Sequence, residues 1–555
     1  STTPTDIENG KLYTLKLSNI TTGGADVPFT PYNVEELNST AGFKYGDENG
    51  GNISIKILAG TIADQYGNTS VDQSFEIGNI DATKPRVYPV QNIQNAEAGT
   101  ETIIFNVTDR NYDSTDLITL DVDKNGDGVV DPEITVWLDG NQIDSEVIKQ
   151  LTYKPIYLDA TTIVGHQYTL VLSEIVETDE QCSISGRAYR ELSGTIEIRI
   201  EQDAVKDVKG NILNGDVTIS DYIDYIKPEL KELTVANPIN TTDKTYTTSF
   251  EIRDKYLDDT SEDTLKVQED EIKVYVDGEL ATAIAKPETA EAQESNKDKI
   301  WMELESTSIT ATFKKTVNGT ITNGNYTVGH TYTLVLSNFE QSVKQSGKNF
   351  IEWSGTVKIV IDQDAVNDKN GQTGEVINIL DSDETKRTVG GAHVDFIKPV
   401  VEKVNSTRGT NTETIIFDVL DKYLDTNDVL EDDEIIVYVD EETATLTKTL
   451  TKTAKFVMNK ETKEVITQTS DYEVQSTEQV VGERYQLILS GFEQSTRNAK
   501  NYKDWSGTVS IEIPVNAVKD TTGNTLDSNI EKRTLNGGFV DFINPDIKYT
   551  YQSTD

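Results

Sequence analysis

The chain has 555 residues and a formal net charge of −45, so it is too long for one domain and suits three or four. A molecule this negative repels nucleic acid and anionic membrane surfaces, and we expect cations as its natural small partners. The one cysteine, Cys182, excludes a disulfide framework, and no apolar run approaches the roughly 18 residues of a membrane helix.

Residues 1–80 resemble the second half of a repeat. The segment Gly10-Lys-Leu-Tyr-Thr-Leu-Lys-Leu-Ser18 recurs three times with substitutions. The three matching segments begin at Gly165, Gly329 and Gly482, deep inside the later repeats. We therefore expect a partial domain at 1–80, and the first strand of a further domain or a tail at 542–555. Either the segment belongs to something longer, or its two ends complete each other between molecules.

Short links divide the rest of the chain. The link Asp81-Ala-Thr-Lys84-Pro85 recurs as Asp224-Tyr-Ile-Lys227-Pro228, as Asp395-Phe-Ile-Lys398-Pro399 and as Asp541-Phe-Ile-Asn544-Pro545. Regular recurrence of this kind predicts a tandem array of domains. The predicted domains are 81–223, 224–394 and 395–541.

Each full repeat is predicted to be all-β. Runs such as Ile134-Thr-Val-Trp-Leu-Asp139 and Ile272-Lys-Val-Tyr-Val-Asp277 alternate with period two and are rich in β-branched and aromatic residues. Short strands, regularly spaced turns and no long helical period indicate a two-sheet sandwich per repeat. The third repeat is longer, and its Ala-, Glu- and Lys-rich piece at 285–299 predicts a short surface helix.

These motifs resemble those of a known class of proteins. The Asp-x-x-Lys-Pro link, the Ala-Val-x-Asp-x-x-Gly-Asn turn and the acidic loops are similar to the tandem immunoglobulin-like repeats of bacterial cell-surface proteins, such as surface-layer proteins and adhesin stalks. The resemblance implies an extended array of immunoglobulin-like sandwiches outside the cell, with no enzyme activity and often stiffened by calcium.

An acidic loop in the second repeat gives the sharpest local signal. With Asp123 as position 1, oxygen ligands stand at positions 1, 3, 5 and 9 and glycine at position 6, the spacing of a loop that wraps around Ca²⁺. Position 12 is Ile134, so Asp121 or Glu133 would have to replace the usual closing carboxylate. The alternative is a solvated hairpin loop. The predicted ligands are Asp121, Asp123, Asn125, Asp127, Asp131 and Glu133.

Further acidic residues are predicted to converge on the links. In an immunoglobulin-like sandwich the second and sixth strands both run back toward the start of the domain, so the loops that follow them should meet the preceding link. A hard divalent cation with several oxygen ligands would relieve their repulsion; alternatively, these aspartates only form turns. The three predicted calcium sites are Asp81 with Asp109, Asp113 and Asp207; Asp224 with Asp254, Asp258 and Asp368; and Asp395 with Asp421, Asp425 and Asp520.

Catalytic interpretations find little support in the sequence. No nucleophile elbow, phosphate loop or His-Glu-x-x-His run is present. His166 and His330 share one repeat position with Lys11 and Glu483, which predicts a surface residue at a strand edge. Trp353 is predicted to anchor a core.

The sequence therefore predicts a non-enzymatic structural protein of the bacterial cell surface, located in the cell wall or surface layer. We expect a rod of sandwiches made rigid by Ca²⁺, which associates with itself or with neighbouring surface proteins. Two alternatives stay open: the stalk of an adhesin for a host or glycan ligand, and the accessory array of an extracellular enzyme. Flanking sequence would distinguish them, through a wall-binding module, a tip domain or a catalytic domain.

Overall fold

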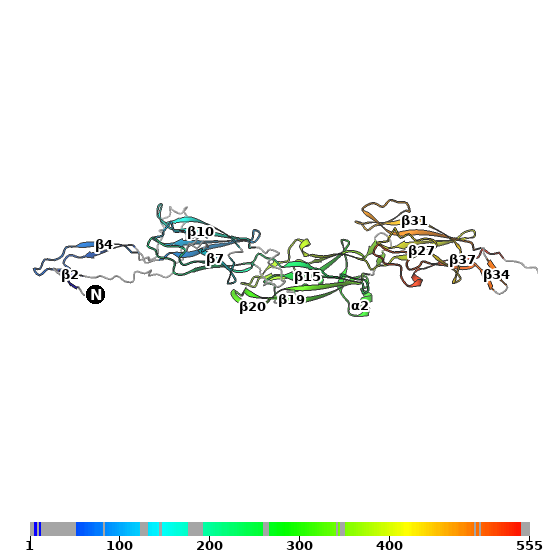
Figure 1. The fold of residues 1–555 in the computed structure, drawn as a ribbon, viewed down its shortest axis with the longest axis horizontal. Helices are drawn as coiled ribbons and strands as arrows, with labels where there is room; N and C mark the ends of the chain where they lie inside the picture. Colours follow the sequence, from blue (N-terminus) through cyan, green and yellow to red (C-terminus); the bar gives the residue numbers. More distant parts are fainter. Residues whose placement is uncertain are drawn as a thin grey trace, which may run out of the picture.

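The computed structural model describes residues 5–7, 10–12, 51–80, 84–121, 131–143, 147–175, 192–258, 266–339, 342–344, 350–492, 495–498 and 501–544. Its β-sheets follow one another along the long axis of an extended molecule (Figure 1). The N-terminal part contributes two antiparallel pairs: β1 (Thr5–Ile7) with β2 (Gly10–Leu12), and β3 (Gly51–Ile57) with β4 (Gln73–Ile80).

The second repeat folds into a sandwich of two four-stranded antiparallel sheets, which we call the second sandwich. One sheet has the order β5 (Arg86–Asn95), β6 (Thr100–Thr108), β10 (Ile163–Ser173), β9 (Ile148–Tyr157). The other has the order β12 (Val217–Ile223), β11 (Gly194–Ile200), β7 (Ile134–Leu138), β8 (Asn141–Gln142).

The third sandwich repeats this arrangement with additions. Its first sheet has the order β13 (Glu229–Leu233), β15 (Thr245–Arg253), β20 (Thr320–Ser337), β19 (Ile300–Val317), β18 (Ala283–Ala285), with β14 (Ile239–Asn240) also paired to β15. Its second sheet has the order β17 (Glu279–Leu280), β16 (Ile272–Val276), β23 (Gly355–Ile361), β26 (Thr388–Val394). Smaller elements are β21 (Ser342–Lys344), β22 (Phe350–Glu352), β24 (Asn367–Lys369), β25 (Val376–Ile379), η2 (Glu269–Glu271) and η3 (Glu384–Arg387).

The short helix predicted at 285–299 is confirmed as α2 (Ala290–Ser295), which buries no residue. Its first turn is capped by Thr289, whose side chain accepts a hydrogen bond from the Ala292 amide. The helix leads directly into β19, which forms an 18-residue hairpin arm with β20.

The fourth sandwich has the same two-sheet order. One sheet contains β27 (Val400–Arg408), β28 (Thr412–Leu420), β33 (Glu478–Ser490), β31 (Thr447–Asn459), β32 (Val465–Thr469), and the other β30 (Glu442–Thr443), β29 (Ile436–Val439), β36 (Gly507–Glu512), β37 (Thr534–Val540). A small pair, β34 (Ser495–Asn498) with β35 (Asn501–Asp504), and the turn η4 (Ile530–Lys532) complete it.

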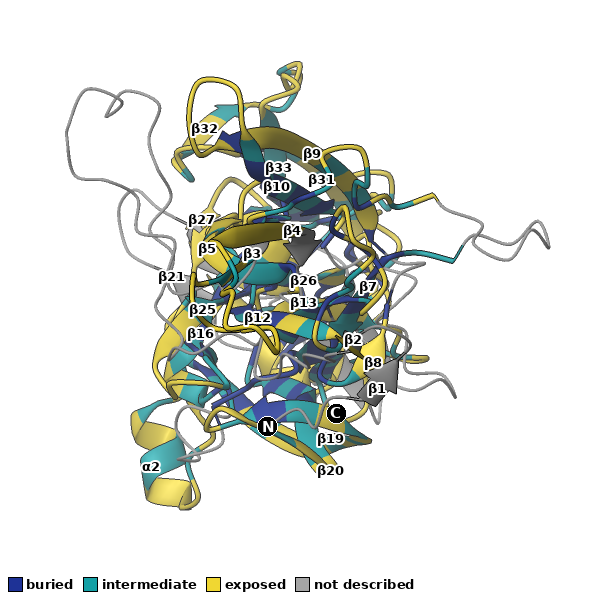
Figure 2. Cartoon of the chain, turned by 90° about the vertical axis from the view of Figure 1, so that its left-hand side faces the viewer, coloured by how far each residue is buried: buried dark blue, intermediate teal, exposed yellow. Residues whose placement is uncertain are grey.

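The strand order identifies the sandwich type. Seven strands recur in every full repeat. Numbered along the chain without the additional short strands such as β8, β17 and β30, they pair as 1-2-5-4 in one sheet and 7-6-3 in the other, which is the arrangement of immunoglobulin-like domains. The second strands β6, β15 and β28 share one alternating burial pattern, so the same faces point inward in all three copies. Buried residues occupy the interior between the sheets (Figure 2). The all-β, immunoglobulin-like fold is therefore confirmed.

One sequence-based placement is wrong. His166 and His330 are buried on β10 and β20, which are inner strands paired on both sides, rather than surface residues at an edge. His166 Nδ1 lies 3.0 Å from the Tyr112 hydroxyl, and burial lowers the pKa of His166. Glu483 takes the equivalent place in the fourth sandwich, where it is buried against Lys452 and the Tyr485 hydroxyl. In the second and fourth sandwiches this buried position holds a histidine or a glutamate because each of these copies supplies its own polar partner.

Candidate functional site: the joints between sandwiches

Three aspartates meet at the joint between the third and fourth sandwiches. Asp395 directly follows β26, Asp421 directly follows β28, and Asp520 lies in the turn after β36. All three are buried, and each offers a carboxylate oxygen that lies within 4.8 Å of those offered by the other two. The structure thus brings together three of the four residues predicted for this joint, from three separate segments.

Each member of this cluster also shapes its own loop. Asp421 Oδ1 accepts the Tyr423 amide at 2.7 Å, and Asp520 Oδ1 accepts the amides of Thr522 and Asn524 at 2.8 Å each. Asp395 Oδ1 accepts the Ile397 amide at 3.1 Å. The turn-forming role and the clustering are therefore compatible, because one oxygen of a carboxylate can close a turn while the side chain still faces its neighbours.

The chemistry of the cluster suits a hard cation. Two ionised carboxylates about 5 Å apart repel by roughly 3 kcal/mol at the effective dielectric of protein sites, and three such pairs exist here. Oxygen atoms bound to one Ca²⁺ at about 2.4 Å are separated by no more than about 5 Å, which matches the spacing of the cluster. The donor set fits calcium.

The joint between the second and third sandwiches differs. Asp254 and Asp368 are buried, and Asp224 Oδ2 accepts the Tyr222 hydroxyl at 3.2 Å. Within the described residues, Asp224, Asp254 and Asp368 do not form a group as close as that of the fourth repeat. Asp258 pairs with Lys369 at 2.6 Å and remains a predicted ligand.

At the first joint, Asp81 lies outside the described residues. Asp109 and Asp207 are buried, and Asp207 accepts the amides of Lys209 and Asn211 at 2.7 and 2.9 Å. This turn repeats that of Asp520. The two carboxylates remain predicted ligands.

Asp113 and Asp425 act as turn formers. Asp113 Oδ1 accepts the amide and hydroxyl of Thr115, and Asp425 Oδ1 accepts the amide of Asn427 at 3.0 Å. The hydrogen bonds from Thr115 lower the pKa of Asp113. One carboxylate oxygen of each closes its own loop, and within the described residues Asp425 does not belong to the close group of Asp395, Asp421 and Asp520. Both residues remain predicted ligands.

Of the predicted calcium-binding loop at 121–133, the structure describes only the two ends. Asp123, Asn125 and Asp127 fall in 122–130, outside the described residues, while Asp121 is exposed and Asp131 partly exposed. Glu133 is buried, and its Oε2 accepts the Thr119 amide at 2.7 Å. The equivalent carboxylates also accept a backbone amide, Glu271 from Gln268 at 2.7 Å and Glu434 from Glu431 at 2.9 Å. Glu133 therefore has a structural role shared by all three sandwiches.

A second contact at the joints was missed by the sequence analysis. The Lys255 ammonium reaches from the third sandwich to Asp139 Oδ2 at 2.9 Å and to the Ser193 carbonyl, both in the second sandwich. In the next joint, Lys422 makes the same pair of contacts with Asp277 Oδ2, at 2.8 Å, and the Ser354 carbonyl. We call each lysine with its aspartate a lysine clasp.

Aromatic residues complete each clasp. The tyrosine after each lysine directs its hydroxyl to the same aspartate: Tyr256 to Asp139 at 3.4 Å, and Tyr423 to Asp277 at 2.6 Å. Each tyrosine also packs edge-on against a ring of the preceding sandwich, Tyr256 on Tyr222 and Tyr423 on His393. The repeated Asp-Lys-Tyr at 254–256 and 421–423 was the available signal in the sequence.

The clasp aspartates sit in strained turns beside a glycine. Asp139 and Asp277 have φ values of 45° and 50°, and each accepts an amide of the sixth strand, from Thr195 at 3.0 Å or Thr356 at 2.8 Å. A Cβ on Gly194 would lie 2.3 Å from the Asp139 carboxylate, so only glycine fits there. The turn and the glycine together present the second carboxylate oxygen to the next sandwich.

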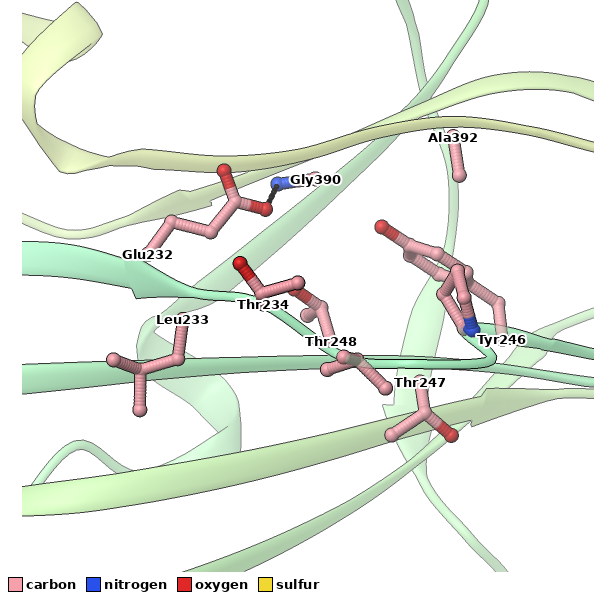
Figure 3. Close-up of a pocket in the computed structure, with 10 residues that line it drawn as sticks. Glu232, Leu233, Thr234, Tyr246, Thr247, Thr248, Gly390 and Ala392 are labelled. Atoms are coloured by element: carbon pink, nitrogen blue, oxygen red, sulfur yellow. Dashed lines mark hydrogen bonds between the residues drawn. The ribbon is translucent and has the colours of Figure 1, made fainter.

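A cavity of about 310 Å³ lies in the third sandwich, between β13, β15 and β26 (Figure 3). Its titratable side chains are Glu232 and Tyr246, among threonines and apolar residues. Glu232 Oε1 accepts the Gly390 amide at 2.9 Å and so ties the two sheets together. The one carboxylate in this lining, Glu232, already has a structural role. The lining therefore does not resemble an active site in which a base activates a nucleophile.

Comparisons with known proteins add little. No protein-family model matches the chain, and no curated protein matches it. Among solved structures, the chain is similar to native alpha-2-macroglobulin from Escherichia coli spanning domains MG0-NIE-MG1, at 10% identity and a TM-score of 0.16, covering 81% of this chain and 98% of that one. A likeness this distant carries no argument. Within the described residues, no helix is both long and apolar enough to cross a membrane.

Proposed function

We propose that this chain is a non-enzymatic structural protein of the bacterial cell surface, a rod of immunoglobulin-like sandwiches that Ca²⁺ makes rigid and that forms part of a surface layer or surface fibre. The serial arrangement of sandwiches supports it (Figure 1). So does the charge of −45, because a strongly acidic protein gains most from cation binding where its carboxylates are buried together.

The observation that carries the calcium proposal is the buried group of Asp395, Asp421 and Asp520. It joins the link to two loops of the fourth sandwich. A cation held there would share ligands across the joint, so bending would cost coordination bonds. Without a cation, motion between domains is the default for small interfaces.

The test compares the full chain with Asp520→Asn in Ca²⁺ and in chelator. Asparagine still accepts the amides of Thr522 and Asn524 but removes a charge from the cluster. Asp159→Asn is the matched control, because Asp159 likewise closes an exposed turn by accepting the amides of Thr161 and Thr162 at 2.8 Å each, outside any cluster.

We expect Ca²⁺ at 100 times its dissociation constant to stabilise the fourth sandwich by about 2.7 kcal/mol in the parent chain and in the control. The Asp520→Asn chain should lose one bound ion by native mass spectrometry, together with that stabilisation. Equal calcium stoichiometry and equal melting curves for all three proteins would refute a site at this cluster.

A further inference from the structure

The fourth sandwich carries a third copy of the surface that receives a lysine clasp. Asp440 occupies the turn position of Asp139 and Asp277, with φ 47°, and its Oδ1 accepts the Thr508 amide at 2.7 Å. A Cβ on Gly507 would lie 2.2 Å from the Asp440 carboxylate, the same fit as in the other two copies. We call Asp440, Thr508 and Phe539 the terminal socket.

Phe539 corresponds to the ring against which each clasp tyrosine packs. Strand pairing places Phe539 opposite Thr508, as it places Tyr222 opposite Thr195 and His393 opposite Thr356. All three positions therefore present a ring beside the clasp aspartate. The acidic group, the close glycine and the ring are present together in each copy.

The terminal socket differs from the other two in its exposure. Phe539 is 65% exposed, whereas Tyr222, which packs against Tyr256, is 5% exposed. Asp440 is exposed, and no lysine or arginine of the described part of the chain forms an ion pair with it. A large exposed aromatic beside an exposed carboxylate in a strained turn is the composition of a binding surface for an aromatic and a cation.

We propose that the terminal socket docks another β-sandwich of the same kind, which inserts a lysine and the following tyrosine from the loop after its second strand. The two occupied clasps of the same molecule indicate what the occupant is. In each, a lysine ammonium pairs with the clasp aspartate and a tyrosine ring packs against the ring of the preceding sandwich. The chain's own Lys255 and Lys422 are already held in its two internal joints, so neither of them fills the terminal socket of the same molecule.

The path of the chain supports this choice. Asp541 directly follows β37, as Asp224 follows β12 and Asp395 follows β26. A sandwich joined through this link would therefore lie next to the terminal socket, as the third sandwich lies next to Asp139 and the fourth next to Asp277. The proposal rests on the proposed function as a serial rod and does not depend on calcium.

The test extends the full chain at its last link with a second copy of residues 399–541, which supplies an additional Lys422 and Tyr423. Spin labels on the original and added fourth sandwiches, after Cys182→Ser, report the distribution of distances between them in chelator. We expect one narrow distribution when the sandwiches are docked.

Asp440→Asn should lower the ratio of docked to undocked molecules roughly tenfold to a hundredfold, since it keeps the turn but removes the charge that faces the ammonium. Lys422→Met in the added copy should do the same, and the double change should add little. Asp433→Asn, an exposed acid on the same sandwich, is the control and should change nothing.

The outcomes separate the two proposals. A narrow distribution in chelator that Asp440→Asn broadens supports the terminal socket, whatever calcium does. A broad distribution in the extended parent chain, or equal distributions for Asp440→Asn and Asp433→Asn, overturns it. Phe539→Ser is a second test variant, which removes the ring but leaves the Asp440 turn intact. An unchanged distance distribution for this variant would also count against the proposal.

Discussion

Replacing Lys255 by methionine should loosen the joint between the second and third sandwiches more than any exposed charge change. Lys255 and Asp139 are only 5% and 1% exposed, and their charged atoms are 2.9 Å apart. Asp139 also accepts the Thr316 hydroxyl at 2.7 Å, from the tip of the long hairpin arm. Removing one partner of a buried pair leaves an uncompensated charge, which costs about 3–5 kcal/mol.

The equivalent change in the next joint should cost less. Asp277 is 23% exposed, so water can screen the carboxylate that Lys422→Met leaves behind. We expect about 2 kcal/mol there, between the values for buried and exposed pairs. The difference between the two expected costs comes from the burial of the aspartates alone, because the ammonium-to-carboxylate distances of the two pairs are nearly equal.

Hydrogen exchange measures the effect locally, as a chain of several domains does not unfold in one step. The Thr195 amide, which donates to Asp139, should exchange about 100-fold faster or more in Lys255→Met, while the Thr508 amide of the fourth sandwich stays unchanged as an internal reference. Asp139→Asn with Lys255→Met removes both charges and should recover most of the protection. Unchanged exchange in the single variant, or no recovery in the double one, would refute the reasoning.

Further predictions concern pH, a strained turn and calcium. Burial, reinforced by the nearby Asp221 carboxylate, raises the pKa of Glu101 to about 7, so between pH 4.5 and 7 the folded chain holds a proton that the unfolded chain has lost. Stability of the second sandwich should therefore fall by up to about 3 kcal/mol as the pH rises through that window, and Glu101→Gln should abolish the slope in pH-dependent denaturation. Glu441, at φ 67°, stands where the other two clasp turns have glycine, and Glu441→Gly should stabilise the fourth sandwich by about 1 kcal/mol in chemical denaturation. Small-angle scattering should give a narrow particle shape in millimolar Ca²⁺ and a broader ensemble in chelator, and identical curves would argue against cation-dependent joints.

Much of the fold could be predicted from the sequence because its signals are local. Alternation at Ile103, Phe105 and Val107 marks a strand with one buried face, and the same pattern recurs in the later repeats. Immunoglobulin-like topology then predicts which ends of which strands meet, and that was sufficient to bring Asp395, Asp421 and Asp520 together in advance.

What only the tertiary structure decided depends on which loop of one sandwich meets which turn of the next. Lys255 and Asp139 are 116 residues apart and belong to different domains, so no periodicity links them. Asp258 pairs with Lys369, and Asp224 accepts the Tyr222 hydroxyl, two contacts that the sequence pattern did not indicate. A repeated motif reports that a residue type is needed at a position; the packing of neighbouring domains determines which partner that residue binds.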